Sequence, residues 1–200
     1  MVVSYLKRFL RLYAGLLLCA VSILLAIQGS VGVTPWDVFH IGLQNLTGIS
    51  YGTINILVGL CILGISFLLG EKIGAGTICN TLSVGYMVDF LRYLDLIPTA
   101  SSIWMGGAMV LASLFVLAAG SFLYIGSGLG CGPRDSMMTA LSKRFTRIPV
   151  GLIRGSIETV VLVIGFFLGG PVGVGKASAW VDGKCAATAE LTFVLTDPNA

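Results

Sequence analysis

The sequence predicts an all-α polytopic membrane protein, and three observations lead to this fold class. Of the 200 residues, 56% are hydrophobic and 10% are charged, and the mean hydropathy is +0.96. A soluble domain carries about 25% charged residues, so this chain could not cover a surface that faces water. The apolar residues are gathered into long runs, and two of these runs end in similar motifs.

Five runs are candidates for membrane-spanning helices, because each is close to the roughly 20 mostly apolar residues that a span needs. They cover residues 10–31, 51–69, 78–97, 102–125 and 150–168. The third run is the weakest candidate, since it contains Asp89, Arg92 and Asp95, and ionisable residues inside a bilayer are costly. The frequent glycines suit close helix packing in lipid.

The placement of lysine and arginine predicts the orientation, since basic loops stay in the cytoplasm. Lys7, Arg8 and Arg11 lie before or at the start of the first run and place the N-terminus inside. We interpret this segment as an uncleaved span, because its apolar core is long for a signal peptide. Residues 32–50 contain no lysine or arginine and are expected outside, whereas residues 126–149 are expected inside because they carry Arg134, Lys143, Arg144 and Arg147.

An internal repeat relates the two halves of the chain. The stretch "GVTPWDVFHIGL" from Gly32 aligns with "GCGPRDSMMTAL" from Gly130, which pairs Pro35 with Pro133 at an offset of 133 − 35 = 98. One extra residue in the second loop then moves the offset to 99, and the match continues to residues 76 and 175 and includes glycines, prolines and charges. Three spans per unit is an odd number, so the two units are predicted to insert with inverted topology, as in many secondary transporters.

The repeat divides the chain into a first three-span membrane unit over residues 1–97, a second unit over 98–175, and an atypical polar tail over 176–200. The match stops at Thr77 against Lys176, where the sixth span should begin. We interpret the tail as a sixth span lost through a frameshift or truncation, which leaves five spans present. The alternative is a genuine polar tail.

Each Pro-x-Asp segment is expected to break the chain and begin a short amphipathic helix, over residues 36–46 and 134–145. Proline suits the first helical turn, and an acidic residue there complements the helix dipole. Asp37 and Asp135 therefore either cap these helices or line a substrate path. His40, the single histidine, is either an interfacial polar residue or part of a proton relay, and Trp36 is expected to anchor at the interface.

Polar residues inside the spans are further candidates, because they default to functional roles. Arg154 and Glu158 lie four apart on one helical face and form either a structural pair inside the bundle or a substrate or proton site. Asp89 and Arg92 are expected to pair with each other. The complete set of substrate-path candidates is Pro35, Asp37, His40, Asn55, Pro133, Arg134, Asp135, Arg154 and Glu158.

The sequence contains no pattern typical of catalysis or of cofactor binding. A nucleophile elbow, a His-Glu-x-x-His motif, a phosphate-binding loop and a cluster of metal ligands are all absent from it, so we expect neither an enzyme nor a cofactor. The five cysteines lack Cys-x-x-Cys spacing and suit small buried hydrophobes. With a net charge of +3 and no basic patch, we expect no nucleic-acid partner.

The stretches "GVTPWDVFHIGLQNLTGISYG" and "GLGCGPRDSMMTAL" resemble those of the bacterial YczE/YyaS/YitT-type integral membrane proteins, over about residues 10–175. The resemblance implies a multi-pass protein of the bacterial cytoplasmic membrane, surrounded by lipid. It implies no substrate and no catalytic residues.

The leading hypothesis for function is a small secondary transporter or exporter of a small solute, whose coupling ion and direction the sequence leaves open. The motivation is the inverted repeat with its two broken helices. The alternative is a non-transporting membrane accessory or scaffold protein. The small size of the chain is compatible with a homodimer.

Overall fold

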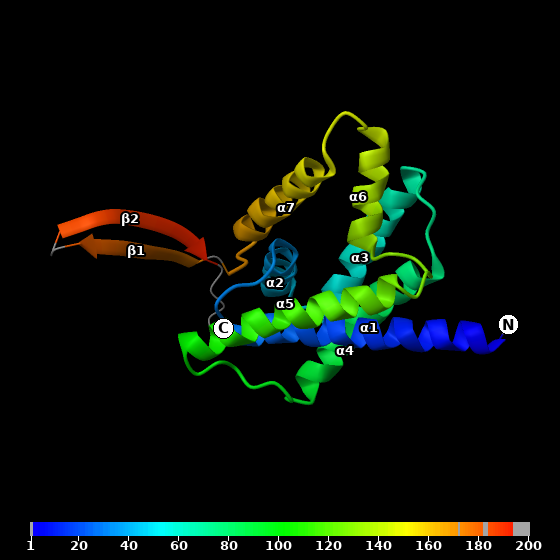
Figure 1. The fold of residues 1–200 in the computed structure, drawn as a ribbon, viewed down its shortest axis with the longest axis horizontal. Helices are drawn as coiled ribbons and strands as arrows, with labels where there is room; N and C mark the ends of the chain where they lie inside the picture. Colours follow the sequence, from blue (N-terminus) through cyan, green and yellow to red (C-terminus); the bar gives the residue numbers. More distant parts are fainter. Residues whose placement is uncertain (1, 172, 182–183, 194–200) are drawn as a thin grey trace.

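A computed structural model describes residues 2–171, 173–181 and 184–193 of the chain, with side chains over residues 5–171. Within these residues the chain forms seven helices and then two strands (Figure 1). The elements are α1 (Val2–Gly29), α2 (Pro35–Thr47), α3 (Tyr51–Leu68), α4 (Ala75–Tyr93), α5 (Ile103–Ile125), α6 (Pro133–Arg144), α7 (Val150–Phe167), β1 (Gly173–Val181) and β2 (Lys184–Phe193).

Four of the described helices are long and apolar enough to cross a membrane, namely α1, α3, α5 and α7. They correspond to the first, second, fourth and fifth of the predicted spans, and their length and composition are those of a membrane protein. The third predicted span forms α4, a helix of 19 residues that is not among these four. Its Asn80, Asp89 and Arg92 lower its hydropathy.

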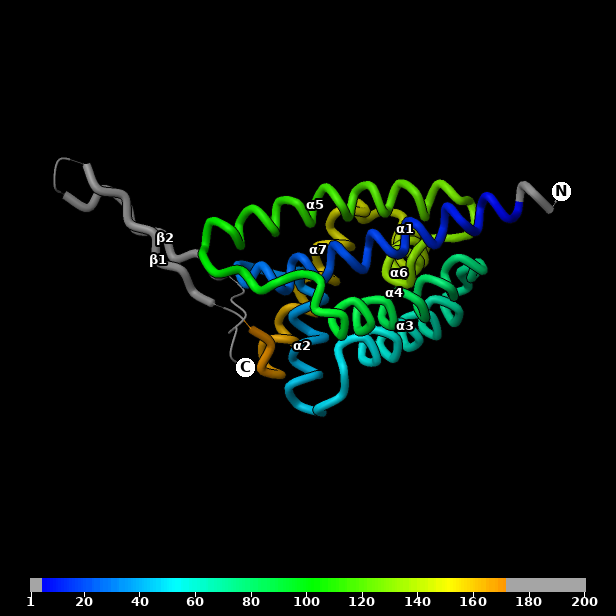
Figure 2. The backbone as a smooth tube through the Cα atoms, turned by 90° about the horizontal axis from the view of Figure 1, so that it is seen from below, coloured from blue at the N-terminus to red at the C-terminus, as the bar shows by residue number. Residues whose placement is uncertain are grey.

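Helices α1 and α5 lie side by side (Figures 1 and 2), and small residues allow them to approach closely. A Cβ atom added to Gly15 would lie 2.7 Å from the carbonyl oxygen of Gly120. The hydroxyl of Ser22 donates a hydrogen bond of 2.8 Å to the carbonyl oxygen of Ser113. Small residues and short hydroxyl contacts are the usual means of joining helices in lipid, where apolar burial gives no driving force.

Helix α4 packs along α3 in the opposite direction. Gly52 of α3 lies against the backbone of Gly85, and farther along α3 a Cβ atom on Gly59 would lie 2.7 Å from the methyl carbon of Thr81. The side chain of Asp89 joins the two helices at one end. The two helices therefore cover the same length of the bundle (Figure 2).

Asp89 satisfies the first turn of α3. Its carboxylate accepts hydrogen bonds from the Ser50 hydroxyl at 2.6 Å and from the Gly52 backbone amide at 2.8 Å. Such a carboxylate fills the role of a cap, since the first amides of a helix have no partner within it. The expected pair of Asp89 and Arg92 is therefore wrong, and the two ion pairs formed within the described residues involve other side chains.

The two short helices pack on long helices from the other half of the chain, α2 on α7 and α6 on α3. The contact between α2 and α7 is close, because a Cβ atom on Gly42 would lie 2.9 Å from the carbonyl oxygen of Gly165. Each short helix thus packs on a long helix of the other half of the chain. This packing brings the two Pro-x-Asp motifs together in the interior, although they lie 98 residues apart in sequence (133 − 35).

Two strands form the last described elements, and β1 begins at Gly173, before the predicted tail. β1 and β2 pair antiparallel, with an irregularity between Ala179 and Trp180. Residues 182–183 and 194–200 of the predicted tail lie outside the described residues. Among the described residues, no helix follows α7 in the way that α4 follows α3.

Candidate functional site

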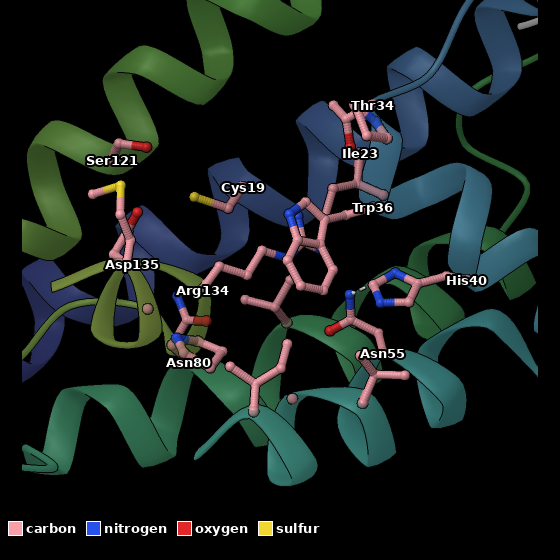
Figure 3. A pocket seen from close by; sticks show the side chains of 18 of the residues that line it. Cys19, Ile23, Thr34, Trp36, His40, Asn55, Asn80, Ser121, Arg134 and Asp135 are labelled. Carbon is pink, nitrogen blue, oxygen red and sulfur yellow. Dashed lines mark hydrogen bonds between the residues drawn. The ribbon is translucent and has the colours of Figure 1, made fainter. Parts of the chain in front are cut away.

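A cavity of about 280 Å³ lies where the helices meet, and each of the seven described helices contributes to its lining (Figure 3). Every substrate-path candidate except Asp37 lines it. Those candidates are Pro35, His40, Asn55, Pro133, Arg134, Asp135, Arg154 and Glu158. The fold thus gathers residues that the sequence places on four separate helices.

Asp37 is buried, with 2% of its surface exposed, and it holds the start of α2. One carboxylate oxygen accepts hydrogen bonds from the Thr34 hydroxyl at 2.7 Å and from the Thr34 amide at 3.3 Å. The Thr34 hydroxyl in turn accepts from the Asp37 amide at 3.4 Å, which completes a capping box. The other carboxylate oxygen accepts from the Tyr51 hydroxyl at 2.7 Å. The cap interpretation is therefore confirmed for Asp37.

Asp135 occupies the same place in the second motif but has different contacts. Helix α6 begins after Gly132, and no side chain caps its first turn. One Asp135 carboxylate oxygen, Oδ2, accepts a hydrogen bond of 3.0 Å from the Tyr124 hydroxyl. Within the described part of the chain this is the only hydrogen bond to the carboxylate. The carboxylate consequently keeps unused acceptor capacity while lining the cavity.

The two Pro-x-Asp motifs meet through Trp36 and Arg134, which follow the two prolines. The central guanidinium carbon of Arg134 lies 4.9 Å from the centroid of the Trp36 ring, in the range of a cation–π interaction. Trp36 is only 8% exposed, so its expected place as an interface anchor is corrected to a buried one beneath Arg134. Among the described residues, Arg134 has no ion pair and no hydrogen bond from its side chain.

His40 is buried rather than interfacial, with 1% of its surface exposed. Its Nδ1 atom lies 3.5 Å from the side-chain nitrogen of Asn55, at the limit of a hydrogen bond. Its Nε2 atom is buried without a partner among the described residues. Burial, and next the positive charge of Arg134, hold the pKa of His40 well below its ordinary value of 6.5.

A neutral imidazole has one donor and one acceptor nitrogen. When the Asn55 amide donates to Nδ1 of His40, the ring carries its proton on Nε2 and can donate from there. An unsatisfied buried polar group costs about 1–3 kcal/mol. The Nε2 atom is therefore an unsatisfied buried donor of a ring that lines the cavity.

Arg154 and Glu158 form the expected pair, with Nε and Oε1 2.9 Å apart. The pair lies at the open margin of the cavity, however, since 63% and 36% of the two side chains are exposed. The expectation of a pair inside the bundle is therefore corrected. The reason is that this part of α7 has few neighbours, with Ile153 as its one buried residue before Gly165.

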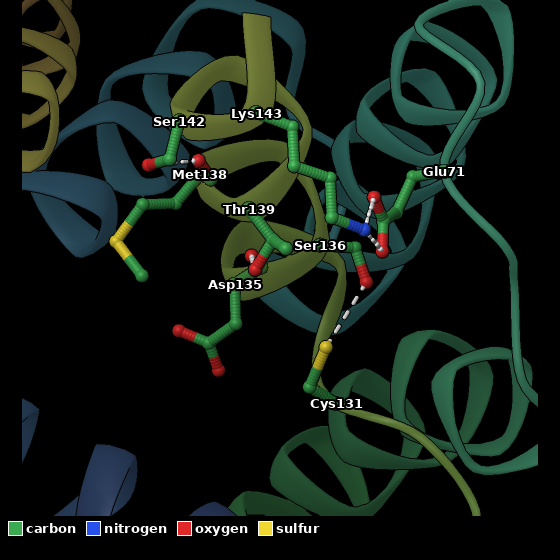
Figure 4. A network of polar contacts seen from close by, with 8 residues as sticks. All are labelled: Glu71, Cys131, Asp135, Ser136, Met138, Thr139, Ser142 and Lys143. Carbon is green, nitrogen blue, oxygen red and sulfur yellow. Dashed lines mark hydrogen bonds and ion pairs between the residues drawn. The ribbon is translucent and has the colours of Figure 1, made fainter. Parts of the chain in front are cut away.

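Contacts on α6 away from the cavity hold this helix in place (Figure 4). The ammonium of Lys143 lies 2.7 Å and 3.0 Å from the two carboxylate oxygens of Glu71, just after α3. The hydroxyl of Thr139 donates to the backbone carbonyl of Asp135 at 2.9 Å. The ion pair links the end of α6 to the end of α3, whereas the Thr139 hydrogen bond lies within α6 itself.

Among the residues of the site that sequence reasoning missed are Tyr124 and Ser121 of α5. Each Asp of the repeated motif accepts a hydrogen bond from a tyrosine hydroxyl, but Tyr51 begins α3 whereas Tyr124 ends α5. Tyr51 and Tyr124 do not align with each other in the repeat, so the alignment could not reveal that both bind an aspartate of the motif. No group of three metal-binding side chains is found in the part of the chain that the structure describes.

The chain matches a family described as "Family of unknown function (DUF6198)" over residues 6–179. The chain belongs to this family. It is 33% identical over 169 residues to the uncharacterized membrane protein YczE of Bacillus subtilis (strain 168), which covers 82% of this chain and 75% of the relative.

Two other relatives of this DUF6198 chain cover a similar length. It is 30% identical to an uncharacterized protein of Haemophilus influenzae (80% of this chain, 75% of the relative). It is 24% identical to the uncharacterized protein YyaS of Bacillus subtilis (80% of this chain, 81% of the relative). No solved structure matches the chain significantly. The resemblance to YczE-type proteins is thus confirmed.

Proposed function

We propose that this DUF6198 chain is a small secondary transporter or exporter of a small solute in the bacterial cytoplasmic membrane. The observation that carries the proposal is the cavity, which helices from both halves line and in which the two broken segments meet through Trp36 and Arg134. In transporters built from inverted repeats, the substrate site lies between the repeats and is formed by discontinuous helices.

The packing of the helices supports two inverted units. The repeat relates α1 to α5, α2 to α6 and α3 to α7. Helix α1 packs on α5, while α2 packs on α7 and α6 on α3, which is the pattern expected from a two-fold axis between the units. Gly70 and Gly169, equivalent in the repeat, both have left-handed backbone conformations, with φ of 84° and 81°.

The packing of α4 supports a fifth membrane crossing. It lies antiparallel to α3, a helix long and apolar enough to span, and so would share its depth. Its ionisable Asp89 is used by the first turn of α3. With five crossings, a cytoplasmic N-terminus places the basic loop before α7 in the cytoplasm, as expected of basic loops.

A second candidate is a non-transporting accessory or scaffold protein that binds another membrane helix or a second copy of this chain. Two described helices have wide exposed faces: the buried shares of the apolar windows are 17% in α5 and 11% in α7, against 44% in α1 and 39% in α3. The Arg154–Glu158 pair lies on α7, and charged groups that face lipid are costly. A partner helix could cover this face.

Thiol labelling distinguishes the two candidates. In a variant without native cysteines, Ser121→Cys would place a thiol on the cavity wall, and Ser113→Cys, two turns away on α5 and 4% exposed, is the matched control. A transporter exposes its site alternately to both sides. We expect a membrane-impermeant reagent to label Ser121→Cys from both membrane faces and to label Ser113→Cys from neither. Labelling of Ser121→Cys from one face alone, or from none, would favour the accessory protein.

A further inference from the structure

We propose that the cavity binds a small zwitterion with an aliphatic side chain, in chemical class an α-amino acid. The inference rests on the proposed function and names the class of solute. It follows from two opposite charges that face the cavity, Arg134 and Asp135, each without an ion-pair partner among the described residues.

One wall of the cavity offers unused donors. Stacking on Trp36 occupies one face of the Arg134 guanidinium and leaves its N–H groups free to bind a carboxylate at two points. The His40 ring lies 6.5 Å from the Trp36 ring, centroid to centroid, and its buried Nε2 has no partner among the described atoms. A solute carboxylate bound by these N–H groups would therefore lie at Arg134, beside the indole of Trp36.

The other side of the cavity offers an unused acceptor. Figure 3 shows Asp135 on the side of Ser121 and Cys19, away from His40 and Asn55. The Asp135 carboxylate accepts one hydrogen bond, from Tyr124, although it has capacity for about four. An ammonium group brings three donors and a positive charge.

The remaining charges at the cavity compensate each other. Arg154 and Glu158 form an ion pair at the open margin, so they add no net charge. One cation and one anion are left over, on Arg134 and Asp135. A solute that is only an anion or only a cation would leave one of them uncompensated, and charges in a low-dielectric interior are costly without partners.

The size and the apolar lining limit the solute further. A volume of about 280 Å³ corresponds to about nine water molecules, at roughly 30 Å³ each. The lining also includes six aliphatic side chains, Ile23, Val58, Ile62, Val84, Leu117 and Ile157. This combination fits a compact solute with a branched aliphatic side chain.

Binding to the purified full-length chain tests this assignment. With Trp104→Phe and Trp180→Phe, Trp36 remains the single tryptophan and reports on the neighbouring Arg134. The probes are L-leucine, 4-methylpentanoate, which lacks the ammonium, and 3-methylbutylamine, which lacks the carboxylate. We expect L-leucine to bind saturably and about tenfold or more tightly than either analogue, because each analogue loses one charged hydrogen-bonding group.

Two variants test which solute charge each residue binds. The measured quantity is the ratio of the affinities for two probes, which does not change when part of the protein is unfolded. Arg134→Gln should abolish the preference for L-leucine over 3-methylbutylamine, and Asp135→Asn the preference over 4-methylpentanoate. Arg144→Gln, an exposed arginine at the end of the same helix, should preserve both preferences. Ratios that stay unchanged in Arg134→Gln and Asp135→Asn would overturn the assignment.

The outcomes separate this inference from the proposed function. Labelling of Ser121→Cys from both faces, together with no preference for L-leucine over its analogues, would overturn the class of solute and leave transport standing. Preferential binding of L-leucine with labelling from one face would support the site and overturn transport. Absence of L-leucine binding overturns the inference in either case.

Discussion

Replacing Asp37 by alanine should destabilise the fold far more than replacing Asp135, although the two residues are equivalent in the repeat. Asp37→Ala removes a capping box and the acceptor of the buried Tyr51 hydroxyl. Loss of a cap costs about 1 kcal/mol, and an unsatisfied buried group costs about 1–3 kcal/mol. The expected loss in free energy of unfolding is therefore about 2–4 kcal/mol.

Asp135→Ala is the matched control. Its carboxylate accepts one partly buried hydrogen bond and caps no helix, so the expected loss is at most about 1.5 kcal/mol. Unfolding of both variants by titration with sodium dodecyl sulfate, followed by circular dichroism, measures the difference. Equal losses, or a larger loss for Asp135→Ala, would refute the distinction between a structural and a cavity-lining aspartate.

Three further changes test the packing, the orientation and the buried histidine. Gly52→Val should destabilise the fold, because a Cβ atom at this position would meet the backbone of α4. Gly151, the equivalent residue in the repeat, has open space around it, so Gly151→Val should be neutral in the same unfolding assay. Leu46→Cys and Phe145→Cys, both exposed at the ends of the short helices, should react with an impermeant thiol reagent from opposite membrane faces, and labelling from one common face would exclude inverted units. Because the pKa of His40 is lowered in the fold, the contribution of His40 to stability is present above pH 6.5 and is lost as the pH falls. His40→Leu should therefore flatten the decline in the free energy of unfolding between pH 7.5 and pH 5. An unchanged decline would contradict this.

The parts of the fold that depend on local pattern could be predicted from the sequence. Apolar runs of sufficient length predicted the helices α1, α3, α5 and α7, since length and hydropathy decide whether a segment can span. The Pro-x-Asp segments predicted both short helices, because proline and an acidic residue favour a first helical turn. The repeat directed attention to residues that the fold then brings to one cavity.

Contacts between distant segments could not be predicted in the same way. Asp89 and Arg92 are three residues apart on one helix, a spacing that suggests a pair, yet the unsatisfied amide at the start of α3 is the better partner for Asp89. Nothing local to Trp36 indicates Arg134 as its neighbour, because their contact exists only when α2 and α6 lie at the same cavity. The burial of His40 likewise follows from the packing of α2 between α3 and α7.

The unequal burial of the long helices has a consequence for motion. Helices α1 and α3 have a large share of their apolar windows enclosed, whereas α7 has 11% enclosed, and it packs mainly on α2. Segments with few buried contacts open at lower free energy than the rest of a fold. Helix α7 is therefore expected to be held least tightly of the four long apolar helices, whereas α2 stays tied to α3 by the hydrogen bond from Tyr51 to Asp37. In hydrogen exchange, the amides of α7 would be the first among the long helices to lose protection.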